Sequence, residues 1–411
     1  MEVLLAGGAV RDTLMGRPVR DRDYVVLGAT PEQMLALGYH QVGQDFPVFL
    51  HPKTREEYAL ARTQRRSVMP DGSRVAHAAP DVTLEEDLAR RDLTINAMAM
   101  TNAGDIVDPH GGRADIAARV LRHVRDESFH EDPVRVLRLA RFSARYRDFD
   151  VAPETMALVA RMVRAGELAN LVAERVWAEI AKGLMEDKPS RMFELMREMG
   201  VLQVVLPELA ALWGVPQPAA HHPEIDTGVH VMMVVDRAAS VGAPLEVRFA
   251  ALMHDLGKAV TPVEAWPTHH KHERLGVKPI KAVCARLRVP SACRDLAVIV
   301  CQEHSLVHGV ERLQASTVVN LVSRMGALKN PHRLDAVLLA CECDARGRLG
   351  FEQRAYPQAL RLRAAWAAVT RVSGGEIARV CKSPAQIVDR LHQARVSAVK
   401  RALRQFDATT A

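Results

Sequence analysis

The sequence contains few aromatic residues, which limits the ways in which the protein could bind nucleic acid. Phenylalanine, tyrosine and tryptophan together make up 4% of the 411 residues. Stacking of bases on aromatic rings is therefore not expected to dominate such contacts. The net charge of +6 is compatible with a polyanionic partner without identifying one, and phosphate contacts would come mainly from arginine.

Cysteine is also scarce. The six cysteines are irregularly spaced and do not follow the pattern of a disulfide framework. Cys341 and Cys343 form a single C-x-C pair, whereas zinc sites usually combine two pairs. We therefore expect reduced thiols.

Long apolar runs are absent. No segment is long enough to cross a bilayer, and residues 1–5 lack the charged region and cleavage site of a signal peptide. We expect a cytoplasmic protein without a membrane partner, either a monomer or a homodimer. A chain of 411 residues exceeds one ordinary hydrophobic core, so we expect two to four domains.

Strand-like and helix-like patterns alternate up to about residue 110, and from about residue 130 the apolar period is helical. We expect four strands, at residues 3–6, 23–27, 46–50 and 57–61. Short helices are expected at residues 9–15 and after the capping signals at Thr30. Residues 65–80, which contain glycine, serine and proline, are expected to form a mobile loop. The fold class predicted is an α+β head with a small mixed sheet, followed by all-α domains.

Two aspartates, Asp21 and Asp23, follow a turn with the sequence GGAVRD at residues 7–12. Residues i and i+2 of a strand point to one face, so both carboxylates can bind one magnesium cluster. Gly8 lets backbone N–H groups approach an anion where a helix begins, and Arg11 adds a guanidinium. Carboxylates that bind metal beside a phosphate site predict nucleotide transfer from a triphosphate, with Asp21 and Asp23 as catalytic residues. Glu57 is a candidate third carboxylate.

Three further blocks of sequence follow this turn. They are RRDLTINA at residues 90–97, DPHGG at residues 108–112 and EDPVR at residues 131–135. In this order the four blocks resemble the tRNA nucleotidyltransferase and bacterial poly(A) polymerase family, class II. The resemblance implies that CTP and ATP are used to add the 3′-terminal CCA of tRNA, with release of pyrophosphate and with Mg²⁺ at the two aspartates.

The resemblance also implies which residues bind the nucleotide: Gly8, Arg11, Arg91, Asp132, Arg135 and Arg138. Asp132 and Arg135 are three residues apart, and we expect them to share one helix face. A carboxylate acceptor beside a forked guanidinium donor can imitate the edge of a complementary base, although the pair alone would more simply be an ordinary ion pair. Arg138 lies one turn further along, and Arg91 is expected to reach the triphosphate.

A second constellation is rich in histidine. His230 is followed by His254 and Asp255, and then by His304. Imidazole and carboxylate ligands together suit a transition metal better than magnesium. The set resembles the HD phosphohydrolase superfamily, which implies metal-dependent hydrolysis of 2′,3′-cyclic phosphates, 2′-nucleotides or phosphatase substrates, with Ni²⁺ as one candidate metal.

Three other residues near this constellation are candidates for its site. Lys258, in the sequence HDLGK at residues 254–258, could bind phosphate. His272 is the histidine of the following loop that best fits the spacing of the superfamily. Asp344 is a less favoured final carboxylate, because it lies far along the sequence.

These patterns predict four domains: a catalytic head at 1–135, a helical neck for nucleotide selection and tRNA binding at 136–222, an HD domain at 226–330 and a helical tail at 331–411. A proline-rich stretch before His230 is expected to be a hinge. Arginines such as Arg141, Arg145, Arg361 and Arg363 either contact tRNA phosphates or form solvated helix faces.

Two alternative functions stay open. A poly(A) polymerase of the same family would share the motifs of the head, but by resemblance the HD unit accompanies bacterial CCA-adding enzymes. An RNA-binding protein with inactive sites would not need intact metal-binding and nucleotide-binding motifs.

Overall fold

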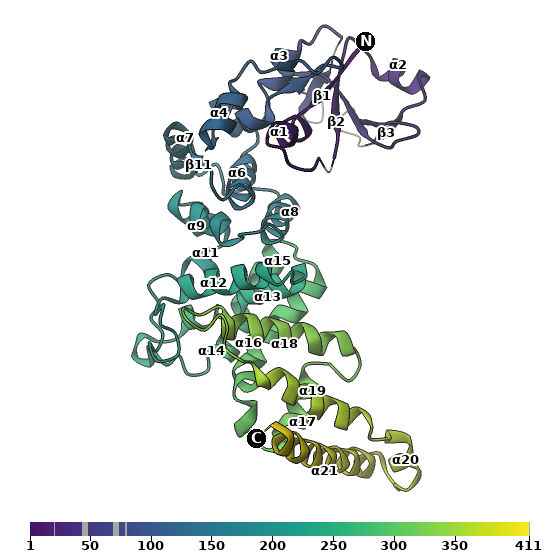
Figure 1. Cartoon of the computed structure of the whole chain (residues 1–411), viewed down its shortest axis with the longest axis vertical. Coiled ribbons are helices and arrows are strands. Elements are labelled where there is room, and N and C mark those ends of the chain that lie inside the picture. Colours follow the sequence, from purple (N-terminus) through teal and green to yellow (C-terminus); the bar gives the residue numbers. More distant parts are fainter. Residues whose placement is uncertain (20, 43–47, 69–73, 79, 411) are drawn as a thin grey trace. The chain divides into compact units, whose positions relative to one another are not determined.

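The chain divides into two units, Met1–Leu171 and Val172–Ala411. A computed structural model describes residues 1–19, 21–42, 48–68, 74–78 and 80–410. Figure 1 shows strands with helices in the first unit and helices alone in the second. The predicted fold class, an α+β head followed by all-α segments, is confirmed. The boundary between the units lies before the proline-rich stretch, and the division into four domains stays a prediction.

A seven-stranded mixed sheet forms the centre of the first unit, with the order β3-β4-β5-β2-β1-β8-β9. The strands are β1 (Glu2–Ala6), β2 (Asp23–Leu27), β3 (His40–Val42), β4 (Val48–Leu50), β5 (Glu57–Leu60), β8 (Ala99–Met100) and β9 (Ile106–Val107). β2 and β5 are parallel, whereas the other neighbours are antiparallel. The register of the parallel pair places Asp23 opposite Glu57, which decides the geometry of the candidate site.

Both faces of this sheet are covered by buried side chains. Successive residues of β2 point to opposite faces and therefore belong to different clusters. Val25 packs in one buried cluster with Leu88, and Val26 packs in another with Met34 and Phe49. The helices of the unit are α1 (Gly8–Leu14), α2 (Pro31–Ala36), α3 (Leu84–Leu88), η1 (Thr94–Asn96), α4 (Gly112–Ala118), α5 (Asp126–Glu131), α6 (Arg135–Arg145) and α7 (Pro153–Arg164). The predicted capping box at Thr30 is present at the start of α2.

We expected a loop over residues 65–80, but most of the described residues in this range form strands. β6 (Arg62–Val68) and β7 (Arg74–Ala78) form an antiparallel two-stranded sheet. The proline, glycine and serine that suggested a loop fall between these strands, at residues 69–73, which lie outside the described residues. A second small sheet joins β10 (Val120–Leu121) to β11 (Asp150–Val151) in parallel.

The second unit is built around α13 (Leu245–Met253), whose residues 247–253 are all buried. This helix packs against α12 (Thr227–Ser240), α16 (Ser291–His308) and α18 (Pro331–Arg346). The other helices are α8 (Ala173–Leu184), α9 (Ser190–Glu198), α10 (Leu202–Val205), α11 (Pro207–Ala210), η2 (Lys258–Val260), η3 (Val263–Ala265), α14 (His272–Leu275), α15 (Val277–Arg286), η4 (Val310–Arg312), α17 (Ala315–Arg324), α19 (Pro357–Thr370), α20 (Gly374–Arg379) and α21 (Pro384–Thr410).

Two of the arginines considered for tRNA contact are buried. Arg361 of α19 is 9% exposed and forms an ion pair with Asp407 of α21, and Arg141 of α6 is 7% exposed. Arg363 pairs with Asp335 at 2.9 Å, and Arg145 pairs with Asp12 at 3.1 Å. Arg361 and Arg141 are thus removed from the surface that could meet tRNA phosphates.

Candidate functional sites

The predicted catalytic aspartates lie where β2 begins. Asp23 is the first residue of β2 and Asp21 precedes it by two residues, and both are exposed. The register aligns Asp23 with Glu57, the first residue of the parallel strand β5, and Glu57 is exposed as well. Directly opposed residues of neighbouring strands project from the same face of a sheet. Three carboxylates therefore belong to one edge of the sheet, which is an oxygen-rich set suited to Mg²⁺.

The electrostatics of Asp23 reflect the partial burial of its carboxyl between Arg91 and a second carboxylate. The pKa of Asp23 is raised above its ordinary value, mainly because its carboxyl is partly withdrawn from solvent. The guanidinium of Arg91 opposes this rise, while the neighbouring Asp21 carboxylate adds to it. A bound cation would remove the repulsion between Asp21 and Asp23, so the residues present fit a divalent metal ion.

Gly7 makes room for Arg91 beside these carboxylates. The φ angle of Gly7 is 71°, in the region that favours glycine, and a Cβ atom there would lie 2.5 Å from Nη1 of Arg91. Arg91 also pairs with Asp87 at 3.4 Å and donates to the backbone oxygen of Asn96 at 3.4 Å. The first glycine of the GGAVRD turn is thus required both by the backbone conformation and by the approach of a guanidinium.

Arg11, which the resemblance assigns to the nucleotide, lies in a buried network. It is 3% exposed, donates through Nε to Asp12 at 2.9 Å, and hydrogen-bonds to the side chain of Asn96. Its guanidinium lies 5.2 Å from the ring centre of Tyr146, whose hydroxyl donates to Asp12 at 3.0 Å. Gly8 is the first residue of α1 and lies close to this guanidinium: a Cβ at Gly8 would be 3.3 Å from Nη2 of Arg11. These contacts give Arg11 a positioning role.

Asp92 holds Arg138 in place. Nε of Arg138 donates to Oδ2 of Asp92 at 2.8 Å, and the amide of Asn96 donates to Oδ1 at 2.9 Å. Burial alone would raise the pKa of Asp92, but Arg138 and Asn96 lower it well below its ordinary range. Asp92 therefore stays ionised, and it fixes Arg138 relative to the segment that contains Arg91.

The expectation that Asp132 and Arg135 share a helix face is wrong. Asp132 is the residue after α5, and α6 begins at Arg135. The intervening Pro133 explains the break, because a residue that precedes proline is pushed out of the helical region. A turn still keeps the two residues together, since the amide of Arg135 donates to the backbone oxygen of Asp132 at 3.0 Å.

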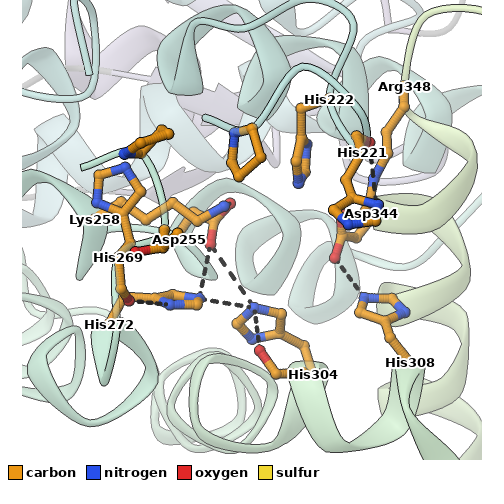
Figure 2. A pocket seen from close by; sticks show the side chains of 14 residues that line it. His221, His222, Asp255, Lys258, His269, His272, His304, His308, Asp344 and Arg348 are labelled. Atoms are coloured by element: carbon orange, nitrogen blue, oxygen red, sulfur yellow. Dashed lines mark hydrogen bonds and ion pairs between the residues drawn. The ribbon is translucent and has the colours of Figure 1, made fainter. Parts of the chain in front are cut away.

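Histidines and aspartates from five segments converge in the second unit, and Figure 2 shows Asp255, His272, His304 and Asp344 of this group. His230 lies on α12, His254 and Asp255 follow α13, and His304 lies on α16. Asp344 of α18, which its position in the sequence disfavoured, is also in this cluster: its Oδ1 lies 3.1 Å from Nε2 of His230. His272, at the start of α14, lies with Nε2 3.2 Å from Nε2 of His304.

Each of the four imidazoles is anchored through Nδ1. His254 donates to the backbone oxygen of Ala251 at 2.8 Å, His272 to that of His269 at 2.9 Å, and His304 to that of Cys301 at 3.0 Å. Nδ1 of His230 lies 2.8 Å from Oε1 of Glu224. Because a carbonyl only accepts hydrogen bonds, Nδ1 carries the proton and the lone pair of Nε2 is free for a metal. The cluster therefore has the tautomers of a metal centre.

The two carboxylates of the cluster are charged. Burial alone would raise the pKa values of Asp255 and Asp344, but neighbouring cations lower both well below the ordinary value. Lys258, considered as a phosphate ligand, donates from Nζ to Oδ2 of Asp255 at 2.7 Å, and Arg348 donates to Oδ1 of Asp344 at 3.0 Å. Burial lowers the pKa of His304 to about 3, so this ring is neutral.

A cleft opens beside the cluster. Its lining includes Asp255, Lys258, His304, Asp344 and Arg348, as Figure 2 shows. His308 is also part of the lining: its Nε2 lies 2.6 Å from Asp344, and its Nδ1 is 2.9 Å from the hydroxyl of Tyr356. Cations and imidazoles around the mouth of a metal-binding cluster suit a phosphorylated substrate. Glu224, Arg348 and His308 were not anticipated, because no motif of fixed spacing contains them.

Three family models match successive parts of the chain. The poly A polymerase head domain matches residues 3–122, a probable RNA-binding site of polymerase A matches residues 148–212, and the HD domain matches residues 227–344. A protein of Cupriavidus taiwanensis described as a multifunctional CCA protein is 58% identical over 98% of this chain and 99% of its own length. A protein of Paraburkholderia phytofirmans with the same description is 58% identical over 98% of this chain and 100% of its own length.

Solved structures show a similar fold. A CCA-adding enzyme described in complex with ATP has a TM-score of 0.64 and 21% sequence identity to this chain. The alignment covers 100% of this chain and 92% of the enzyme's chain. A Thermotoga maritima CCA-adding enzyme described in complex with tRNA has a TM-score of 0.58 and 20% identity, with coverage of 100% and 92%. Among the described residues, no helix combines the length and apolarity that a membrane span requires.

The partial burial of the Asp23 carboxyl, to which repulsion from Asp21 adds, predicts that Asp23→Asn stabilises the metal-free protein. The raised pKa means that the folded state holds its proton more firmly than the unfolded chain does. Stability therefore falls as the pH rises through the pKa of Asp23, and the asparagine variant should lack this loss and gain roughly 0.5 kcal/mol at pH 7. Urea unfolding in EDTA between pH 4 and pH 7 measures both effects. Asp105→Asn, an exposed aspartate of the same unit, is the control; an equal gain in that variant would contradict the interpretation.

The contact between Gly257 and α14 yields a second prediction. A Cβ at Gly257 would lie 1.9 Å from the backbone oxygen of His272 and 2.7 Å from the amide nitrogen of Gly276. Gly257→Ala should therefore push α14 away and lower the free energy of unfolding by about 1–3 kcal/mol. Urea unfolding tests this, with Gly375→Ala as the control, since nothing lies within 4 Å of that position. Equal stability of the two alanine variants would refute the close packing of α14.

Proposed function

Because the chain belongs to the family of the multifunctional CCA proteins, we propose that it adds and repairs the 3′-terminal CCA of tRNA, using CTP and ATP and releasing pyrophosphate. The observation that carries this proposal is the alignment of Asp23 with Glu57, close to Asp21 and Arg91. The curated relatives match the whole chain rather than one part of it. A location in the cytoplasm, and either a monomeric or a dimeric state, belong to the same proposal.

In the first unit, Asp21 and Asp23, with Glu57 as third carboxylate, would hold Mg²⁺. When bound, this metal lowers the barrier to attack of the tRNA 3′-hydroxyl on the α-phosphate and neutralises the leaving pyrophosphate. Arg91 is close enough to Asp23 to place its positive charge beside the triphosphate. Gly7, which has a φ of 71° and no Cβ, leaves the space that Arg91 occupies at that position.

The choice of base is assigned to Asp132, Arg135 and Arg138. A fixed carboxylate and fixed guanidinium groups can form the hydrogen bonds that a template base would otherwise supply. Arg135 donates to the backbone oxygen of Arg91 at 3.3 Å, and Arg138 is held by Asp92. The buried Arg11 would support this arrangement through its hydrogen bond to Asn96 rather than by direct contact with the phosphates.

In the second unit, we assign a metal-dependent phosphohydrolase activity to the histidine cluster. A transition metal would be held by His230, His254, Asp255, His304 and Asp344, the last of which the structure adds to the set. The imidazole ligands favour such a metal, and Ni²⁺ is the candidate. The substrates would be 2′,3′-cyclic phosphates, 2′-nucleotides and other phosphate monoesters. Lys258 and Arg348 balance the buried carboxylates and keep the cleft attractive to anions. Such an activity could prepare damaged RNA ends for the first site.

The four domains are assigned on the same basis. We place the catalytic head at residues 1–135, the neck at 136–222, the HD domain at 226–330 and the tail at 331–411. The matches to the head, RNA-binding and HD models fall in this order and support the sequence of domains, although the HD match continues to residue 344, past the proposed boundary at residue 330.

Separate inactivation of the two sites tests the proposal. Asp23→Ala should lower incorporation of both CTP and ATP into tRNA that lacks its CCA end by at least ~10³-fold, because the metal that activates the hydroxyl is lost. The same variant should keep its activity on 2′,3′-cyclic AMP. His254→Ala should show the reverse pattern.

Three results would contradict this proposal. Loss of nucleotide addition in His254→Ala would mean that the sites are not independent. Long homopolymeric tails made with ATP alone would favour a poly(A) polymerase. Tight tRNA binding without turnover at either site would favour a protein that only binds RNA.

A further inference from the structure

Three of the five tyrosines in the chain gather beside the sheet of the first unit. The rings of Tyr24 and Tyr58 are stacked, with their centres 4.5 Å apart and 18° between their planes. The ring of Tyr39 meets that of Tyr58 edge-on at 5.0 Å, and the ring of His51 lies 5.8 Å from it. Tyr58 is therefore the centre of an aromatic cluster, and none of the four sequence blocks of the head includes these residues.

The stacked tyrosines lie next to the candidate catalytic carboxylates in the strand register. Tyr24 is opposite Tyr58 in the parallel pairing of β2 with β5, one residue after the pair formed by Asp23 and Glu57. Successive residues of a strand point to opposite faces, so the rings and the two carboxylates lie on opposite faces of the sheet. The rings therefore cannot contact a metal ion or a nucleotide held by those carboxylates. Any effect that they have on the carboxylates must pass through the backbone.

The pair of carboxylates does not stabilise the strand pairing by itself. Like charges directly opposite each other on neighbouring strands repel. The ladder between β2 and β5 has four residue pairs and begins with Asp23 and Glu57, the first residues of their strands. The second pair is the stacked tyrosines, and the last two pairs are aliphatic. Aromatic pairs across strands add to the stability of a sheet, so the tyrosines are placed to offset the repulsion beside them.

Tyr58 is held in place from several sides. β4 pairs with the other edge of β5, where the fully buried Phe49 lies opposite Tyr58. Tyr39 and Tyr58 both pack against the buried cluster that contains Phe49, Val26 and Met34. Burial raises the pKa of Tyr58 to about 12, and the neighbouring Tyr39 adds to the rise. The phenol is thus neutral, so its ring acts by packing rather than by charge.

We propose that Tyr58 and Tyr24 are positioning residues for nucleotidyl transfer. Their stacked rings hold β2 and β5 in register from the far face of the sheet, and they thereby keep the carboxylates of Asp23 and Glu57 together against their mutual repulsion. The proposal rests on the function assigned to the first unit, and it adds two residues that contact neither metal nor nucleotide. Loss of the rings should weaken metal binding and slow the chemical step without affecting the binding of tRNA elsewhere on the chain.

Tyr58→Val tests the proposal, because valine suits a strand but has no ring. In the full chain we expect the Mg²⁺ concentration for half-maximal CTP incorporation to rise, and kcat to fall, by roughly 10-fold each, as is typical when the residues that support metal ligands are lost. KM for tRNA should not change. Tyr58→Phe should behave like the parent protein, since phenylalanine keeps the stack and removes only the hydroxyl.

Metal binding is also measured without turnover. Free Mn²⁺ is followed by electron paramagnetic resonance while the full chain is titrated, and the ions of the first site are those lost when Asp21→Ala and Asp23→Ala are combined. Tyr58→Val should bind these ions roughly 10-fold more weakly than the parent protein does. Tyr24→Val should do the same. The double tyrosine variant should be no weaker than either single variant, because both substitutions break the same contact.

Tyr39→Leu is the matched control. Tyr39 touches the same ring at 5.0 Å but lies outside both strands, so its loss should lower the free energy of unfolding in urea and leave Mn²⁺ binding and kcat close to the parent values. An equal loss of metal binding in Tyr39→Leu would overturn the proposal, because the cluster would then act through general stability alone. Parent-like Mn²⁺ binding in Tyr58→Val, or in Tyr24→Val where the first variant does not fold, would overturn it as well.

These outcomes are distinguishable from failure of the proposed function. A parent protein that binds Mn²⁺ through Asp21 and Asp23 but adds no nucleotide to tRNA would refute nucleotidyl transfer, and the Mn²⁺ affinities of the tyrosine variants would still decide the role of the stack. Normal CCA addition and metal binding by Tyr58→Val would refute the positioning role and leave the nucleotidyltransferase standing.

Discussion

The buried negative charge of Asp255 is the interaction on which the second unit depends. Its carboxylate is 1% exposed, and a buried charge of this kind costs several kcal/mol unless opposite charges and hydrogen bonds compensate it. Lys258 contacts it directly, and the remaining neighbours are imidazoles from separate helices. Those helices pack around α13, whose largely apolar buried face helps to hold the ligands at their distances. Packing and metal chemistry are therefore parts of one arrangement.

The first unit meets a similar requirement in a different way. Its carboxylates lie at the surface, where solvent supports most of their charge although Asp23 is partly withdrawn from it, and the sheet has to keep them close together. The parallel pairing of β2 with β5 does this through register. A metal ion at the first site would therefore be open to solvent, whereas one in the cluster of the second unit would be buried.

Much of this could be predicted from the sequence, because the relevant signals are local. The aspartates near β2, the helical period after residue 130 and the HD pair each lie within a short window of sequence. Asp344 could not be ranked in the same way, since only the packing of α18 against α12 brings it to His230. Glu57 likewise depended on strand register. The helix expected through Asp132 failed because a local rule, the effect of Pro133 on its predecessor, outweighed the spacing of the motif.

The network around Asp12 has a mechanical consequence. Asp12, next to Arg11 at the catalytic turn, receives hydrogen bonds from Arg145 and from Tyr146 at the far end of α6, while Arg138 in the middle of that helix is tied to Asp92. α6 is thus pinned at two points to the segments that position Arg91. A helix held at two points in this way cannot rotate without displacing the segments to which it is bonded. Any movement of α6 would therefore be passed on to the segment that carries Arg91, to which Arg135 at the start of the helix also donates a hydrogen bond.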